Sequence, residues 1–93
     1  MIKSFGNPFA EAAWERRFAK GIPNDIIKVA NRKLVQINSA RQLADLRAPP
    51  GNRLEALSGN RKGQHSVRIN DQWRICFRWS DGDAHDVEIV DYH

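Results

Sequence analysis

The hydrophobic pattern changes its period near the middle of the chain. Between residues 8 and 46, apolar residues recur every three or four positions, which is typical of amphipathic helices. From residue 54 onward they alternate with polar residues, which is typical of strands with one buried face. Helices followed by strands predict an α+β fold, with an N-terminal strand and two to three helices packed on an antiparallel four- to five-stranded sheet.

Turn-forming residues divide the first part of the helical half. Residues 2–5 predict a short strand. Asn7 followed by Pro8 predicts a helix start, because Asn caps helix N-termini and Pro is tolerated at the first helical position. Gly21 is the expected end of this helix. The expected apolar stripe comprises Phe9, Ala13, Trp14 and Phe18.

A second helix is expected to begin at Pro23 or Asn24 and to be amphipathic. Ser39 with Gln42 three positions later predicts a capping box for a third, short helix. The Pro-Pro-Gly sequence at 49–51 then ends all helix. The residues expected on the basic outer side of the second helix are Lys28, Arg32 and Lys33.

Four strands are expected in the second half, over residues 54–57, 65–69, 73–79 and 86–90. In the third strand the aromatic and aliphatic residues at odd positions should face the helices, so Arg74, Cys76 and Arg78 face the other way. A hairpin loop at 70–72 places Arg68 opposite Arg74, and Ser66 opposite Cys76. Two opposed arginines repel each other unless an anionic group lies between them.

Charge is distributed unevenly along the chain. Residues 1–74 carry 14 Lys and Arg against 6 Asp and Glu, whereas residues 75–93 carry 1 against 5, giving +8 and −4. A strongly cationic region favours a polyanionic partner, although basic surfaces also serve solubility alone. We therefore expect phosphate binding on the sheet face that carries Arg74.

Length and composition predict one small domain over residues 1–93, located in the cytoplasm. No apolar stretch is long enough for a membrane span, and the first residues lack the apolar core of a secretory signal. A single cysteine, Cys76, cannot form an internal disulfide, which agrees with a reducing compartment. No interaction with a membrane is expected.

Arginines and a lysine from neighbouring strands extend the expected phosphate-binding face around Arg74. Each of them taken alone is more simply explained as a solvated, solubilising charge, and the functional interpretation rests on the set. The residues expected to contact RNA phosphates are Arg53, Arg61, Lys62, Arg68 and Arg78.

The chain ends in Asp91-Tyr92-His93, directly after the last expected strand. Because that strand should pair beside the one that bears Arg74, His93 can reach the edge of the cationic face. An imidazole next to a guanidinium is suited to moving a proton while a charged phosphorane is stabilised. The alternative is a frayed terminal tail. No metal-ligand spacing and no phosphate-binding loop is found, so neither a metal nor a cofactor is expected.

Three segments together resemble the HigB-type toxins of the RelE superfamily: residues 52–59 (NRLEALSG), residues 70–77 (NDQWRICF) and the ending VDYH. The resemblance covers essentially the whole chain. It implies a RelE-like fold and an mRNA-cleaving toxin of a bacterial type II toxin–antitoxin pair, which acts on messages in the ribosome and inhibits translation and growth. It also implies a HigA-like helix-turn-helix antitoxin as the partner. The toxin would then contact operator DNA only through this antitoxin.

Site residues are carried over by position. The resemblance implies that Arg74 binds phosphate, that His93 is the terminal acid/base and that Asp91 and Tyr92 shape the site. It implies cleavage without a metal, by attack of the ribose 2′-hydroxyl on the adjacent phosphate. Basic helix residues, including Arg32 and Lys33, are expected to face the antitoxin.

The chain departs from some HigB-type members at the first strand of the sheet, where Glu55 and Ser58 replace a histidine and a lysine. Glu55 can serve as a base, but a weak one, because a carboxylate among arginines stays ionised. We therefore expect slow cleavage. Equally, Glu55 can act only as a charge partner. Two alternative functions stay open: a non-catalytic RNA-binding subunit, favoured by the loss of the first-strand histidine and lysine, and a ParE-like inhibitor of a protein target.

Overall fold

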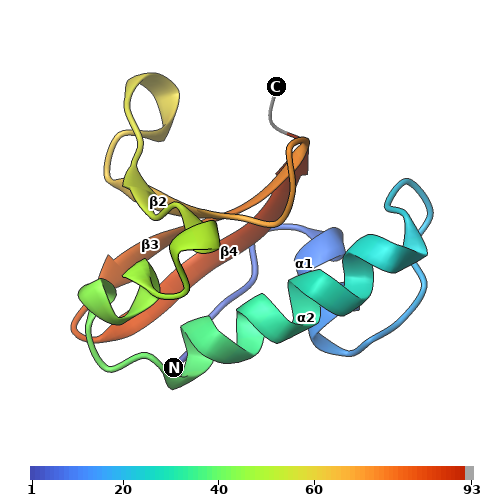
Figure 1. Cartoon of the computed structure of the whole chain (residues 1–93), viewed down its shortest axis with the longest axis horizontal. Coiled ribbons are helices and arrows are strands. Elements are labelled where there is room, and N and C mark those ends of the chain that lie inside the picture. The colour runs from blue at the N-terminus through green and yellow to red at the C-terminus, as the bar shows by residue number, and fades with distance from the viewer. Residues whose placement is uncertain (92–93) are drawn as a thin grey trace.

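Two helices pack on one face of a four-stranded antiparallel sheet in the computed structural model, which describes residues 1–91 (Figure 1). The helices are α1 (Pro8–Trp14) and α2 (Asn24–Ser39). The strands follow in the order β1 (Glu55–Ala56), β2 (Gln64–Arg68), β3 (Trp73–Ser80) and β4 (Asp83–Asp91). Three short 3₁₀ turns connect them: η1 (Leu43–Arg47), η2 (Pro50–Asn52) and η3 (Gly59–Arg61). The predicted α+β class is confirmed.

The expected N-terminal strand is reduced to two isolated contacts. Ile2 and Phe5 form parallel bridges with Ala84 and Val87 of β4. Only two residues pair because the chain turns away after Phe5 to begin α1. The first segment thus covers the outer edge of β4 without forming a fifth strand.

Helix α1 begins as predicted and ends earlier than predicted. The Asn7 side chain accepts the Ala10 N–H, with Pro8 at the first helical position. The helix stops at Trp14, well before Gly21, because Arg16 adopts a left-handed conformation with φ 57°. The N–H groups of Arg16 and Arg17 donate to the carbonyls of Ala13 and Ala12, which is the Schellman arrangement that usually requires glycine.

As a consequence Phe18 is not part of an apolar stripe. It lies beyond the helix end, and 71% of its surface is exposed. The other three residues of the predicted stripe, Phe9, Ala13 and Trp14, do belong to the core or pack against it.

Helix α2 begins at Asn24 as predicted, but its basic side is smaller than predicted. Lys28 and Arg32 are exposed, whereas only 8% of Lys33 is exposed. Lys33 is buried because η2 folds back over α2 and offers the Asn52 side chain as a partner. The third helical element is a 3₁₀ turn capped by Gln42 and Asp45, not by Ser39, which is the last residue of α2.

The strand register matches the prediction. Ser66 pairs with Cys76 and Arg68 with Arg74 across β2 and β3, and Val90 lies opposite Arg74 on β4. A bulge after Cys76 shifts the pairing with β4. β4 begins at Asp83, three residues earlier than expected.

The core lies between the sheet and the two helices. The odd positions of β3 face it, as predicted: Ile75 and Phe77 are fully buried and Trp73 is 6% exposed. From the helices the largest contributions are Leu34 and Ile37, both fully buried. The other face of the sheet is left to Arg74, Cys76 and their neighbours.

Candidate active site

Within residues 1–91, Ser66, Arg53 and Glu55 hold Arg74 on the sheet face away from the helices. Its Nε donates to the Ser66 Oγ at 2.8 Å, and its Nη2 donates to the Arg53 carbonyl at 2.9 Å. The same Nη2 lies 3.3 Å from the Glu55 carboxylate. Only 9% of Arg74 is exposed. The guanidinium is therefore fixed in one orientation, which is the condition for stabilising charge without reorganisation.

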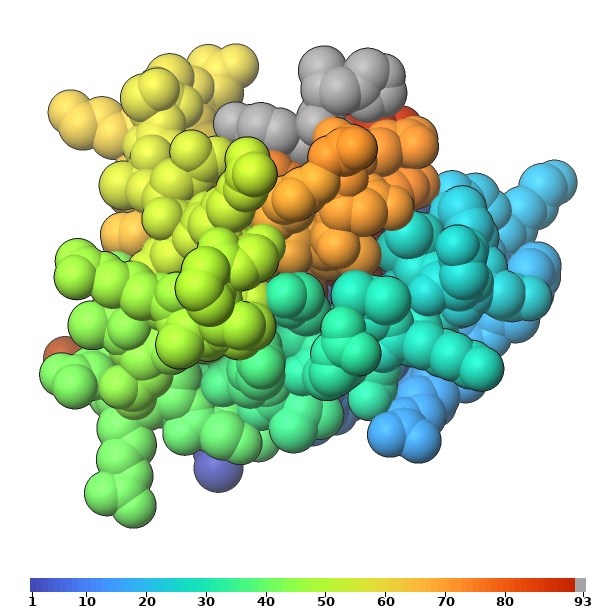
Figure 2. Space-filling view, viewed as in Figure 1, coloured from blue at the N-terminus to red at the C-terminus, as the bar shows by residue number. Residues whose placement is uncertain are grey.

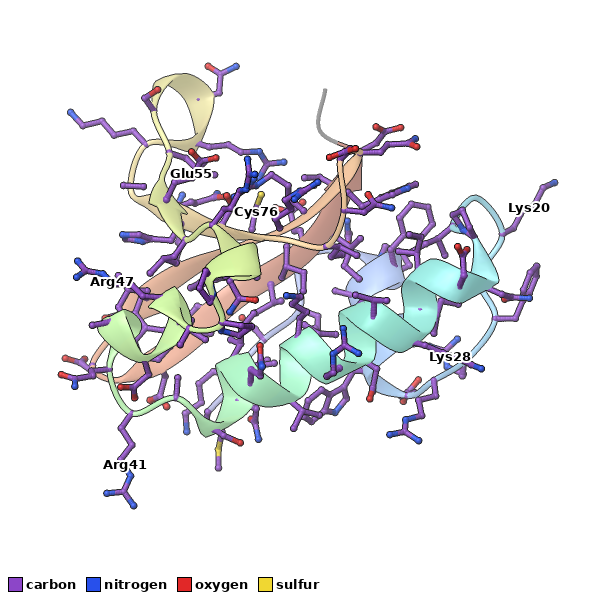
Figure 3. The ribbon with its side chains drawn as sticks, viewed as in Figure 1. Lys20, Lys28, Arg41, Arg47, Glu55 and Cys76 are labelled. Atoms are coloured by element: carbon purple, nitrogen blue, oxygen red, sulfur yellow. The ribbon has the colours of Figure 1, made fainter. Side chains whose placement is uncertain are left out.

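Glu55 is the more accessible member of this ion pair. It lies on β1 directly opposite Ser66, and 52% of its side chain is exposed. Figure 3 shows Glu55 and Cys76 in the same region of the sheet, above η2 in that view. An exposed carboxylate beside a fixed guanidinium can receive a proton from an incoming hydroxyl.

A buried polar cluster positions the Arg53 carbonyl. The Lys33 Nζ lies 2.5 Å from the Asn52 Oδ1, and the Asn52 Nδ2 donates to the carbonyls of Leu46 and Ala48. Asn52 is 1% exposed. Arg53 follows in a left-handed conformation with φ 45°, which turns its carbonyl toward Arg74. The site thus depends on a turn that α2 holds through Lys33.

Burial and nearby cations disfavour the charged form of Lys33. The pKa of Lys33 is lowered from 10.5, first by desolvation and then by the positive charges of Arg32 and Arg68. The Asn52 amide oxygen is a neutral acceptor, so it satisfies the ammonium group without neutralising it. We conclude that Lys33 is a structural residue of the site and not part of an outer basic face.

Cys76 lies beneath Arg74 as a packed thiol. It is fully buried, and burial raises its pKa, so the thiolate needed for nucleophilic chemistry is disfavoured. Cys76 is therefore a packing residue of the sheet.

Most of the arginines expected around Arg74 are paired with carboxylates. Arg61 lies 3.3 Å from Glu88 and also donates to Gln64, and Arg78 lies 3.7 Å from Asp86. Arg68 pairs with Asp71. The expected repulsion between Arg68 and Arg74 is therefore offset by acidic side chains of the chain itself. Among residues 1–91, Arg53 and Lys62 form no ion pair with a side chain.

The C-terminal motif is described only as far as Asp91. This residue ends β4 opposite Trp73, and its Oδ2 accepts from the Gln72 Nε2 at 3.1 Å. Tyr92 and His93 lie outside the described residues. Their assigned roles therefore stay predictions.

Two contributions to the site were not anticipated: the Ser66 hydroxyl and the Arg53 carbonyl. The register already placed Ser66 beside Arg74, so the small hydroxyl residue in a strand was an available signal. The Arg53 carbonyl had no such signal, because its direction depends on the contact between η2 and α2.

Residues 1–91 contain neither a metal-binding cluster nor a membrane-spanning helix. No group of three or more His, Cys, Asp or Glu side chains there is arranged to hold a metal ion. No helix in this part of the chain is long and apolar enough to cross a bilayer.

Solved structures define the class of fold. A chain of the YoeB–YefM complex from Staphylococcus aureus has a TM-score of 0.62 at 19% identity, covering 100% of this chain and 98% of that chain. A chain of the heterotetrameric YoeB–YefM toxin–antitoxin complex from the same species has a TM-score of 0.59 at 21% identity, with the same coverage. At these identities the similarity shows the fold alone.

Sequence comparison then identifies the family. Residues 3–93 match the HigB-like toxins, described as RelE-like toxins of type II toxin–antitoxin system HigB. Toxin HigB-1 of Vibrio cholerae is 49% identical over 63 residues, which are 68% of this chain and 66% of that toxin. Endoribonuclease HigB of Proteus vulgaris is 31% identical over 93 residues, the whole of both chains. The chain belongs to the HigB family of RelE-like toxins, which confirms the predicted resemblance.

Proposed function

We propose that the chain is a ribosome-dependent endoribonuclease that cleaves mRNA in the cytoplasm and thereby inhibits translation and growth. The observation that carries this proposal is the fixed Arg74 guanidinium beside the accessible Glu55 carboxylate. Full-length similarity to a protein named Endoribonuclease HigB supports it.

In the proposed reaction the ribose 2′-hydroxyl attacks the adjacent phosphate. Glu55 takes the hydroxyl proton, Arg74 stabilises the additional negative charge on the phosphorane, and His93 gives a proton to the departing 5′-oxygen. The products are a cyclic phosphate and a free 5′-hydroxyl. Asp91 and Tyr92 shape the site, and the route uses no metal or cofactor.

The Glu55–Arg74 pair implies a slow enzyme. At 3.3 Å the Arg74 guanidinium engages the Glu55 carboxylate, so an incoming ribose hydroxyl must compete with Arg74 for the carboxylate oxygens. An incoming phosphate also competes with Glu55 for Arg74. Both effects lower the rate compared with a neutral base such as histidine.

Ion pairing on the sheet face also explains why a ribosome would be needed. Of the proposed RNA-binding residues Arg53, Arg61, Lys62, Arg68 and Arg78, three are paired, so RNA must share or displace the carboxylates of Glu88, Asp71 and Asp86 at Arg61, Arg68 and Arg78. The gain from those three phosphate contacts is then reduced, so free RNA binds weakly. A ribosome that presents the message in a fixed position supplies the missing binding free energy.

The partner that inhibits the toxin is proposed to be a HigA-like helix-turn-helix antitoxin. Family membership supports an antitoxin partner. The antitoxin would carry the complex to operator DNA, and the toxin itself would make no separate contact with DNA.

One observation favours a second candidate, a non-catalytic RNA-binding subunit or a ParE-like inhibitor of a protein target. Glu55 is already bound to Arg74, so it can serve as a charge partner without accepting a proton. The two candidates differ in whether a new RNA end is produced.

The test is cleavage by the purified protein on translating ribosomes and on the same message free in solution. We expect fragments with 5′-hydroxyl ends, and only in the presence of ribosomes. Growth arrest without any new RNA end would contradict the proposal and favour the second candidate.

A further inference from the structure

A groove of about 880 Å³ lies between α2 and the segment that follows α1. None of the residues placed around Arg74 lines it, and Figure 2 shows α2 and the chain before it on the side of the molecule away from η3. The groove residues used below are Arg16, Arg17, Phe18, Lys28, Arg32 and Val35.

The wall of this groove is preformed. Asn31 of α2, which is 7% exposed, donates its Nδ2 to the carbonyls of Ala13 and Trp14 at 2.9 and 3.2 Å. Its Oδ1 accepts from the Arg16 Nε at 3.2 Å. Arg16 is the left-handed residue that ends α1. The turn that forms the wall is thus fixed to α2, and a ligand would not have to order it.

The groove combines exposed apolar side chains with a cationic rim. Phe18 is 71% exposed and Val35 is 47% exposed, and together with Met1 they are the exposed large apolar residues of the described chain. The rim carries Arg16, Arg17, Lys28 and Arg32, and no carboxylate is among the lining residues. Arg17 pairs with the adjacent Glu15. Lys28 and Arg32 form no ion pair within residues 1–91.

We propose that this groove binds an amphipathic, acidic segment of the antitoxin. The apolar side of such a segment would cover Phe18 and Val35, and its carboxylates would meet Lys28 and Arg32. This inference rests on the proposed toxin function and adds to it the location and the chemistry of the inhibitory contact.

Two other occupants fit the groove less well. A second copy of this chain, related by a two-fold axis, would bring the same cationic rim against itself. The phosphates of ribosomal RNA would pair with the cations of the rim. They would leave Val35 against a polar backbone, since RNA offers no aliphatic side chain to cover it. An acidic amphipathic segment satisfies both features.

The experiment measures the affinity of the purified toxin for the helix-turn-helix protein encoded next to its gene. The variants are Phe18→Asp with Val35→Asp, and separately Lys28→Glu with Arg32→Glu. All four side chains are exposed, so the melting temperature should stay unchanged. Lys33 is left intact because it is buried, so reversal of its charge would disturb the fold.

We expect the apolar double variant to weaken binding on the order of a hundredfold or more, as loss of central apolar anchors does. The charge reversal should weaken it by roughly tenfold, mainly through slower association. The matched control for the charge reversal is Arg41→Glu, an exposed cation that lies far from Lys28 in Figure 3. It should not change affinity by more than about twofold.

The outcomes separate this inference from the proposed function. Groove variants that still cleave mRNA but escape the antitoxin support the inference. Wild-type protein that binds the antitoxin through the groove but never cleaves RNA would overturn the proposed function alone. Four outcomes would each overturn the inference. They are unchanged antitoxin affinity in both double variants, no antitoxin binding by the wild-type chain, self-association of the chain through the groove, and loss of ribosome binding in place of antitoxin binding.

Discussion

The two cationic regions of this molecule differ in what surrounds their charges. On the sheet face, Arg61, Arg74 and Arg78 each lie next to a carboxylate. On the groove rim, Lys28 and Arg32 stand beside exposed apolar side chains. The Glu55 carboxylate helps to hold the Arg74 guanidinium in one position, as the proposed RNA cleavage requires. Lys28 and Arg32 form no ion pair within residues 1–91, so they can attract the proposed acidic partner. The neighbours of each positive charge therefore distinguish the two proposed roles.

The largest change in cleavage rate should follow removal of His93, which is assigned to the sheet face and not to the groove. Deletion of His93 and His93→Ala should each lower the cleavage rate on translating ribosomes by roughly a hundredfold to ten-thousandfold, the range for a lost general acid or base. Antitoxin affinity and melting temperature should stay at wild-type values. The substitution separates loss of the imidazole from displacement of the terminal carboxylate. Full cleavage by both variants would remove His93 from the mechanism.

Arg74→Ala should lower the cleavage rate by about a hundredfold to a thousandfold, the cost of losing one preorganised charge-stabilising donor. Arg41→Ala is the matched control, because Arg41 is an exposed arginine outside the proposed RNA-binding set. The control should change the rate by no more than about threefold, as for an exposed surface residue. Equal losses in both variants would show that total charge, and not the fixed guanidinium, determines the rate.

Arg74→Ala should also lower the free energy of unfolding, although Arg74 faces away from the core. Arg74 is buried and bonded to Ser66 and to the Arg53 carbonyl. Leaving these acceptors without their donor costs about 1–3 kcal/mol of the free energy of unfolding. Urea unfolding measures this loss. A variant as stable as the wild type would mean that these bonds contribute little to the site.

Ser66→Ala should have a smaller effect on cleavage. It removes the hydroxyl that orients the Arg74 Nε, at a cost of about 1.5 kcal/mol or a roughly tenfold lower kcat, while KM stays nearly constant. Ser66→Thr keeps the hydroxyl and should recover part of the rate. If KM rises while kcat is preserved, Ser66 contributes to RNA binding and does not position Arg74.

The smallest effect should be a change in the pH dependence of stability at alkaline pH. Because the pKa of Lys33 is lowered in the folded chain, the unfolded chain binds more protons between that lowered pKa and 10.5. The free energy of unfolding therefore gains a contribution that rises with pH across this interval. Lys33→Met should lack this rise relative to the wild type. Parallel stability curves for the two proteins would contradict the burial argument.

Local rules explain which parts of the fold were predictable. Asn7 and Pro8 determine the start of α1: the Asn7 side chain caps the Ala10 N–H, and Pro8 lacks an N–H at the first helical position, where none is needed. The register of Arg68 with Arg74 follows from a short loop and a period of two. These features depend on neighbours in the chain, so the sequence contained enough information to place Glu55 and Arg74 on one face.

The features that were mispredicted depend on contacts between distant segments. Arg16 ends α1 in a conformation that favours glycine, and its side chain is anchored by Asn31, fifteen residues away. Lys33 is buried by Asn52, nineteen residues away. Helix periodicity alone cannot detect either contact, which is why the groove with Phe18 was not anticipated.

The sequence by itself determined the class of fold, the family and the residues Glu55, Arg74 and His93 as candidates for RNA cleavage. Only the tertiary structure decided that Arg74 is held by Ser66 and by the Arg53 carbonyl. It also decided which cations are paired on the sheet face and which line the groove beside α2. The physical reason is that propensity and periodicity act over a few residues, whereas burial and charge pairing are set by the segments that fold against each other.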